Sequence, residues 1–220
     1  MTLRLLAPRL AVIPWDGKKL LDGSDDRLDD YPGLAEWWRR AGQTWNTHRS
    51  SDRLTLPGRL DYRRGLSHQF PPPAHRVVYS KGGMYLAAAR VSDPAAVIDH
   101  TLYWAAASTI GEARYLTAIL NRDVLTQLVR PLQARGEHNP RHFDKYIFRL
   151  PISLYDPGDA EHRQLAELAG RAEEAAAALE LPPGVSFQAQ RRRIREALSR
   201  DGLGGEINNL TSALLAAAGQ

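Results

Sequence analysis

Residues 76–91 read RVVYSKGGMYLAAARV, with two runs of strand-forming residues on either side of Gly82-Gly83. Valine and tyrosine favour extended backbone, and glycine readily adopts the positive φ angles that a two-residue hairpin turn needs. The pattern therefore predicts a β-hairpin with Lys81 at its tip. Direct pairing across the turn places one set of residues on one face: Val77, Tyr79, Lys81, Met84, Leu86 and Ala88. The other face then carries Arg76, Val78, Ser80, Tyr85, Ala87 and Ala89.

The segments after the hairpin alternate between strand and helix patterns. Residues 97–107 and 143–150 are predicted strands. Between them, Thr109-Ile-Gly-Glu112 fits a capping box that opens a helix, and Asp123 is placed to cap a second one. Beyond residue 156 the apolar period stays helical.

The segments before the hairpin begin with a predicted helix that opens at Tyr31-Pro32 and continues to Trp45. Its tryptophans recur at helical spacing, which favours a place in the core over base stacking. Residues 47–73 are rich in arginine, serine, proline and glycine, and we expect mostly loop there with short strands.

Together these segments predict an α+β fold. Its sheet is mixed or antiparallel, contains the hairpin around Gly82-Gly83, and is packed with helices. We expect residues 1–155 to form this domain, with residues 1–30 as an extended N-terminal arm, and residues 156–220 to form a C-terminal helical tail. Asn121 is expected to be structural, taking a left-handed turn where two helices meet.

Positive charge is concentrated between residues 39 and 90. This stretch has ten lysines and arginines and two aspartates, whereas the whole chain has a net charge of only +4. A confined basic stretch indicates a polyanionic partner, of which nucleic acid is the commonest. A solvated basic surface is the alternative, and both Lys81 and the arginines of residues 191–195 fit either interpretation.

Composition also excludes several classes of protein. The chain has no cysteine, so disulfides and thiolate metal sites are excluded, which fits a reducing cytoplasm. Its apolar runs are far shorter than the roughly 18 residues that a membrane helix needs. Arg4, Pro8 and Arg9 interrupt the start of the chain in a way that a signal peptide does not tolerate. We expect a cytoplasmic protein without a membrane partner.

Catalytic motifs are absent from the sequence. Asn139-Pro-Arg-His142 is the nearest match to the loop that grips a flipped adenine, but its last two positions differ and no glycine-rich methyl-donor loop precedes it. His100 is expected to be a half-buried histidine with its polar groups satisfied. A metal-dependent nuclease site could be assembled from Asp99, Asp144 and Lys145, on an unspecific spacing. No cofactor is expected.

Three features then follow one another along the chain. The first is the run from Tyr31-Pro-Gly-Leu34 to Trp45, continued by Arg49 and residues 60–69. The second is Tyr115-Leu-Thr-Ala-Ile-Leu-Asn-Arg122, and the third is Leu150-Pro-Ile-Ser-Leu-Tyr-Asp-Pro157 followed by His162-Arg-Gln-Leu-Ala-Glu-Leu-Ala169. Over residues 31–180 this order resembles the target-recognition (specificity) domain of adenine-specific DNA methyltransferases, including fused restriction–modification enzymes. Arg122 stands where that family usually has serine.

The resemblance implies a non-catalytic module that selects a sequence in double-stranded DNA, while a separate methyltransferase domain or subunit does the chemistry. Arginine, glutamine and lysine side chains can bind phosphates or read base edges. The residues expected to bind DNA are Arg49, Arg63, Arg64, Gln69, Arg76 and Lys81, with a second surface of Arg141, His142 and Lys145. Two alternatives stay open, namely a protein-interaction subunit of a DNA-modification or phage-defence complex and the metal-dependent nuclease.

Overall fold

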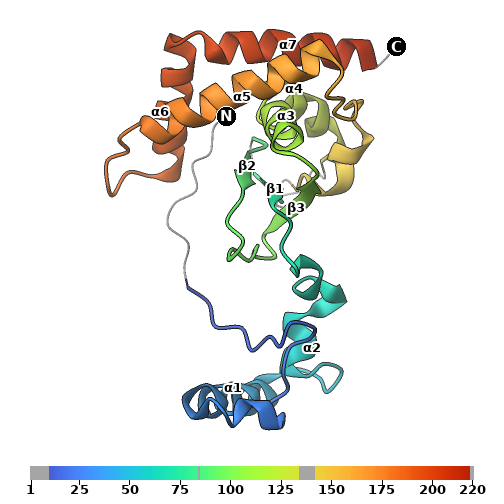
Figure 1. Cartoon of the computed structure of the whole chain (residues 1–220), viewed down its shortest axis with the longest axis vertical. Coiled ribbons are helices and arrows are strands. Elements are labelled where there is room, and N and C mark those ends of the chain that lie inside the picture. Colours follow the sequence, from blue (N-terminus) through green and yellow to red (C-terminus); the bar gives the residue numbers. More distant parts are fainter. Residues whose placement is uncertain (1–9, 84, 134–141, 219–220) are drawn as a thin grey trace. The chain divides into compact units, whose positions relative to one another are not determined.

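The computed structural model describes residues 10–83, 85–133 and 142–218. The chain forms two compact units, one that ends at Pro73 and one that starts at Ala74 and runs to the C-terminus. We call described residues 10–73 the N-terminal unit and described residues 74–218 the C-terminal unit (Figure 1). The expected boundary at residue 156 is wrong, because the helices after it share a hydrophobic core with the sheet.

The C-terminal unit contains a three-stranded antiparallel sheet in the order β2-β1-β3. Its strands are β1 (His75–Ser80), β2 (Ala88–Val91) and β3 (Leu102–Ala107). β3 starts later than expected, because Asp99 closes a turn in which its C=O accepts from the Leu102 N–H and its carboxylate accepts from the Thr101 N–H. This sheet and the helices of the chain confirm the α+β class.

β1 and β2 pair in a register that differs from the expected one by two residues. Tyr79 lies opposite Ala88, so the connection spans residues 81–87 and is not a two-residue turn at Gly82-Gly83. A shift of two residues leaves the side chains of the paired residues of β1 and β2 on their expected faces, and Met84 lies outside the described residues. One face packs against the helices through residues that include Val77, Tyr79 and Ala88. The other face forms a separate cluster that includes Val78, Ala89 and Val91.

Tertiary contacts, not a tight turn, fix this longer connection. The Leu86 N–H donates to Thr126 Oγ1 over 3.1 Å, and the Leu86 C=O accepts from Arg191 over 3.0 Å. On the other side, the Lys81 C=O accepts from the Phe143 N–H over 2.7 Å. The partners come from segments far along the sequence, so the local pattern around Gly82-Gly83 could not reveal the register.

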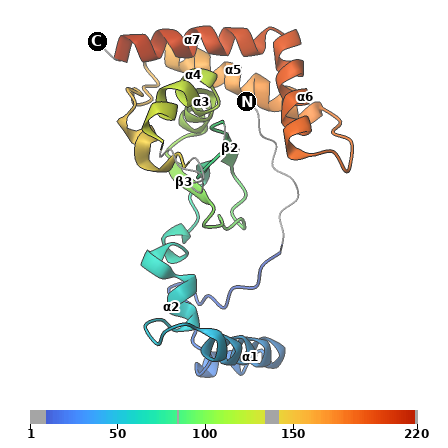
Figure 2. The same ribbon diagram turned by 180° about the vertical axis from the view of Figure 1, so that it is seen from behind.

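The helices of the C-terminal unit cover the sheet in successive layers. Their bounds are α3 Ile110–Leu120, α4 Asp123–Val129, α5 Ala160–Ala178, α6 Phe187–Arg200 and α7 Leu203–Ala218, with short 3-10 turns η4 Arg130–Leu132 and η5 Asp144–Arg149. α3 packs on β1 and β2 and on α5, and α5 packs on α6 and α7 (Figure 2). Among the described helices, none is both long and apolar enough to cross a membrane.

Local signals gave mixed results at the helix boundaries. The capping box is confirmed, since Thr109 Oγ1 accepts from the Glu112 N–H over 3.1 Å. Asp123 is not a cap, because it is the first residue of α4 and pairs with Arg195 on α6. Residues 143–150 form a 3-10 turn and not a strand, and Phe143 and Ile147 are buried in the main core. A short apolar run fits either period, which explains the error.

The N-terminal unit is helical. It contains η1 (Asp26–Leu28), α1 (Pro32–His48), α2 (Leu56–Leu60), η2 (Tyr62–Arg64) and η3 (Ser67–Gln69). The α1 helix is confirmed, whereas the short strands expected in residues 47–73 are replaced by helical turns. Trp38 is buried and donates to the Leu21 C=O, Trp45 is half-buried, and Trp37 remains 40% exposed, so the core role holds best for Trp38.

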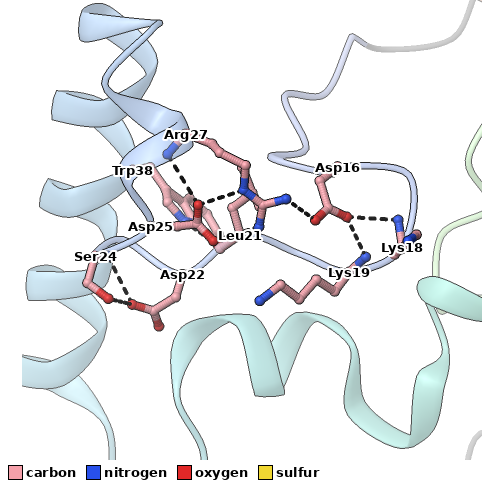
Figure 3. A network of polar contacts seen from close by, with 9 residues as sticks. All are labelled: Asp16, Lys18, Lys19, Leu21, Asp22, Ser24, Asp25, Arg27 and Trp38. Carbon is pink, nitrogen blue, oxygen red and sulfur yellow. Dashed lines mark hydrogen bonds and ion pairs between the residues drawn. The ribbon is translucent and has the colours of Figure 1, made fainter.

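The expected extended arm is only partly described, and its described part is folded. Leu20, Leu21 and Leu28 are buried, and Trp15 stacks on Phe70 with ring centroids 4.8 Å apart. Arg27 pairs with Asp16 and Asp25, and Asp22 accepts from Ser24 nearby (Figure 3). These ion pairs connect distant parts of the segment that precedes α1. Residues 1–9 lie outside the described residues.

Candidate nucleic-acid interface

Two consecutive arginines dominate the exposed surface of the loop between α2 and β1. Arg63 and Arg64 have φ angles of 54° and 61°, in the left-handed region. A left-handed backbone costs a residue with a Cβ roughly 1–2 kcal/mol, and such strain is found most often at functional sites. Gly65, which would tolerate that conformation, follows both arginines and has an ordinary φ of −65°. The strain therefore falls on the two charged residues.

Hydrogen bonds within the loop hold this conformation. The Asp61 carboxylate accepts from the backbone N–H groups of Leu66 and Ser67 over 3.1 and 2.8 Å. Partial burial opposes ionisation of Asp61, but the bonds from Ser67 and Leu66 outweigh it and lower its pKa. The Arg64 N–H donates to the Asp61 C=O over 2.8 Å. The loop is thus built on a charged aspartate and presents the arginines outward.

The exposed arginines of the loop form no ion pair among the described residues, although the charge of Arg64 helps to lower the pKa of Asp61. Arg63 and Arg64 are exposed, and no carboxylate of the described residues lies within 4.0 Å of either guanidinium. Arg53 and Arg59, which our prediction omitted, share both properties. Tyr62 is 49% exposed and carries the Arg63 guanidinium 5.3 Å from its ring centroid. The Tyr-Arg-Arg-Gly sequence of residues 62–65 is the local pattern from which one exposed basic surface on this loop could have been predicted.

Three other predicted residues of this stretch are placed differently. The Arg49 guanidinium forms an ion pair with the Asp52 carboxylate over 2.8 Å, and this pair partly neutralises its charge. Gln69 is wrong as a DNA contact, because it is 3% exposed and its Nε2 donates to the Gly65 C=O. Arg76 is also wrong, because it is fully buried and donates to the C=O groups of Ala96 and Asp93 over 2.7 and 2.6 Å.

Arg76 shows why a positively charged residue in the sequence cannot be assumed to be exposed in the fold. It lies on β1 with its guanidinium aimed at the turn that follows β2, and burial lowers its pKa. Carbonyl acceptors satisfy two of its nitrogens, which is how a buried arginine without a carboxylate partner is tolerated. A strand pattern with arginine at one end does not distinguish an exposed end from a buried one.

A second basic surface lies on the C-terminal unit, where Lys81 meets His142. Gly82 and His142 form an isolated antiparallel bridge next to the Lys81–Phe143 backbone bond, so the two sequence-distant segments lie side by side. His142 is exposed, and the Lys81 ammonium lies 4.8 Å from the centroid of the Tyr103 ring. The structure thus brings together two parts of the predicted site. Arg141 and the Lys145 side chain lie outside what the structure describes.

A serine and a histidine meet in the C-terminal unit but are fixed in a structural role. Ser153 Oγ lies 3.2 Å from His162 Nε2, and Tyr115 Oη lies 2.7 Å from Ser153 Oγ. The His162 Nδ1 accepts from the Asp156 N–H over 3.0 Å, which places the ring proton on Nε2. A protonated Nε2 cannot take the serine proton, so the group is not arranged for nucleophilic catalysis.

The structure describes one of the three side chains of the nuclease alternative, that of Asp99, because the side chains of Asp144 and Lys145 lie outside the described part of the chain. Asp99 accepts from Thr101 and lies 3.2 Å from His100 Nδ1, in an exposed turn. These contacts, with the Thr101 bonds first, lower the pKa of Asp99 to about 2. His100 is exposed, which corrects the expected half-buried position. In the described part of the chain, no three acidic or histidine side chains are grouped so that they could hold a metal.

Comparisons with known proteins give no relatives. No family model matches the chain, and neither a curated protein nor a solved structure is significantly similar to it. The proposal below therefore depends on the geometry and on the motif order alone.

Proposed function

We propose that this chain is a non-catalytic DNA-recognition module that positions a methyltransferase domain or subunit on double-stranded DNA. The observation that carries the proposal is the loop Asp61–Gln69, which uses a buried glutamine and a capping aspartate to present Arg63 and Arg64. A strained backbone beneath two exposed arginines that form no ion pair among the described residues favours a role in binding a ligand. A polyanion is the ligand that two such guanidinium groups favour.

Arginine suits both tasks that the module needs. Its planar guanidinium donates two parallel hydrogen bonds to a phosphate, or to O6 and N7 of guanine in the major groove. Fixing the backbone of Arg63 and Arg64 before binding lowers the conformational entropy that ordering the loop would cost. The neighbouring ring of Tyr62 offers a flat apolar surface beside the charges.

The surface formed by Lys81 and His142 supplies a second contact in this proposal. It belongs to the other unit, so each of the two compact units of the chain carries a basic surface. Contacts to phosphates orient a protein on the duplex, whereas contacts to base edges select the sequence. We assign selection to the strained loop, because a fixed backbone holds the positions from which Arg63 and Arg64 reach the DNA.

The test is a fluorescence-anisotropy titration of the full chain against labelled duplex DNA at several salt concentrations. Binding with a logarithmic salt slope of about −4 or steeper is expected if four or more phosphates are neutralised. Selection from a random duplex library should then enrich one short sequence. A chain that binds no duplex at low salt would contradict the proposal, and one that binds every sequence equally would contradict its recognition role.

A further inference from the structure

A surface cavity of about 350 Å³ lies where the start of α4, the end of α6 and the start of α7 meet. It is distinct from both basic surfaces described above. Its lining includes two arginines (Arg122 and Arg195), two asparagines (Asn121 and Asn208), three glycines (Gly202, Gly204 and Gly205) and Asp123.

Arg122 is a buried cation without a carboxylate partner. Only 6% of the residue is exposed, and among the described residues no acidic oxygen lies within 4.0 Å of its guanidinium. Its Nη1 makes two long contacts, 3.2 Å to Asn208 Oδ1 and 3.5 Å to the Gly204 C=O, and its Nε has no acceptor. A buried charge is costly unless it is paired, so the site is incomplete as it stands.

The nearest carboxylate in the sequence, that of Asp123, does not form an ion pair with Arg122. Asp123 is the next residue along the chain, but its carboxylate is held 2.8 Å from the Arg195 Nη2. Arg195 thereby brings a second positive charge to the cavity wall. Burial lowers the pKa of Arg122 to about 10; the negative charge of Asp123 opposes this effect, and the positive charge of Arg195 adds a smaller effect in the same direction as burial. Arg122 remains charged at neutral pH.

The third part of the wall is the start of α7. This 16-residue helix opens with Leu203, preceded by Gly202 at a φ of +74° and followed by Gly204 and Gly205. Glycine lowers helix stability by about 1 kcal/mol relative to alanine, but it leaves the backbone accessible. Among the described residues, the N–H groups of Leu203 and Gly204 have no acceptor. Free N–H groups at a helix start attract anions.

We propose that this cavity binds a phosphate group, held between the guanidinium of Arg122, that of Arg195 and the glycine-rich start of α7. The buried guanidinium of Arg122, whose Nε has no acceptor, points to the ligand independently of the helix start. The phosphate could come from a free phosphate or phosphorylated small molecule, or from the backbone of a nucleic acid. Neither source requires the strained loop to read a sequence, so the site stands apart from the recognition role.

The experiment is a thermal-unfolding titration of the full chain with sodium phosphate, compared with sodium chloride at equal ionic strength. A ligand that binds only the folded state raises its stability in proportion to the logarithm of its concentration above Kd. We expect phosphate to raise the unfolding temperature of the wild type beyond the effect of chloride. Phosphate also stabilises folded proteins without a binding site, so Arg122→Met should keep only that general part of the difference. Arg193→Met, which removes an exposed arginine of α6 outside the cavity, should keep the whole difference.

A second variant keeps the test decisive if Arg122→Met does not fold. Asp123→Asn removes the exposed negative charge at the cavity and releases Arg195, so phosphate should bind at least about threefold more tightly than to the wild type. Equal responses to phosphate and chloride in the wild type, or unchanged or weaker phosphate binding by Asp123→Asn, would overturn the site.

Measurements of duplex DNA binding distinguish the two possible sources of the phosphate. The salt slope of duplex binding is compared with that of the wild type without phosphate. If this slope is smaller by about one for Arg122→Met, or for the wild type saturated with phosphate, the ligand is a backbone phosphate. If duplex binding is unchanged while inorganic phosphate binding is lost, the ligand is a free phosphate or a phosphorylated small molecule. Both results support the site, and they are independent of whether Arg63 and Arg64 bind DNA.

Discussion

The side-chain amide of Asn121 hydrogen-bonds both backbone groups of Ala88. Its Nδ2 donates to the Ala88 C=O over 2.8 Å, and its Oδ1 accepts from the Ala88 N–H over 3.1 Å. β2 is an edge strand, so these groups face away from β1 and would otherwise have no partner. Asn121 therefore replaces a missing strand and joins the end of α3 to the sheet. Its expected structural role is confirmed, but its φ of −90° shows that the expected left-handed turn is wrong.

Asn121→Ala should destabilise the C-terminal unit strongly. The change leaves the buried N–H and C=O of Ala88 without partners, and unsatisfied buried groups cost about 1–3 kcal/mol each. We expect a loss of about 3 kcal/mol in the free energy of unfolding, measured by urea titration. Asn209→Ala, at an exposed position of α7, is the control and should change it by less than about 0.5 kcal/mol. Equal effects of the two variants would contradict this role.

The N-terminal unit should lose stability in acid. Backbone bonds from Lys19 and Lys18, together with Arg27, lower the pKa of Asp16 to about 2, and Arg27 lowers that of Asp25 to about 2. A carboxyl whose pKa falls on folding stabilises the folded state above its ordinary pKa of 3.8 and loses that contribution as the pH falls toward 2. The unfolding temperature should therefore drop between about pH 4 and pH 2.

Tryptophan fluorescence can follow that transition selectively. Four of the five tryptophans, Trp15, Trp37, Trp38 and Trp45, belong to the N-terminal unit. Arg27→Gln should give a shallower pH dependence, because it removes the main cause of the shift in Asp25. Arg59→Gln, which removes an exposed arginine without an acidic partner, should keep the wild-type dependence. A steeper dependence in Arg27→Gln would argue against this network.

The C-terminal unit should fold without the N-terminal one. A fragment of residues 74–220 keeps the sheet together with α3, α5 and α7, which form one hydrophobic cluster. It should unfold cooperatively in urea and retain its helical circular dichroism. A fragment of residues 1–155 lacks α5 and α7 and exposes the buried face of α3, so it should lose cooperative unfolding of the sheet. Cooperative unfolding of the 1–155 fragment, together with its loss in the 74–220 fragment, would instead support the boundary at residue 156 that the sequence predicts.

The backbone strain at Arg64 can be separated from its charge. Glycine adopts a φ of 61° without the steric cost that arginine bears, so Arg64→Gly should keep or raise the free energy of unfolding, by up to about 1 kcal/mol. The same variant should weaken duplex binding, because the guanidinium is lost. Arg59→Gly is the contrasting variant, since it places glycine inside α2 and should destabilise that helix. Arg64→Gly that loses stability would contradict the assigned strain.

The sequence predicted the parts of this fold that local patterns control. The helices α1, α3 and α5 follow from apolar periods, from proline near the start of α1 and from the Thr109 cap. The faces of the β1–β2 pair follow from the two-residue period. The register does not, because contacts from Thr126, Arg191 and Phe143 fix the connection.

The residues predicted to bind DNA differ in exposure. Arg63, Arg64, Lys81 and His142 contribute to exposed basic surfaces, whereas Gln69 and Arg76 are buried. Burial of a polar side chain depends on which backbone carbonyls lie near it, and that information is tertiary. The boundary between the two units also falls within the basic stretch, where composition changes little.

The most direct test of the central claim is the affinity of Arg63→Glu/Arg64→Glu for duplex DNA, measured by anisotropy at low salt. Two charge reversals on the presented loop should weaken binding at least about tenfold and reduce the salt slope by about two. The matched control, Arg163→Glu/Arg171→Glu, reverses two exposed arginines of α5 and should bind like the wild type. Unchanged affinity of the loop variant, or an equal loss in the control, would contradict recognition of DNA by this loop.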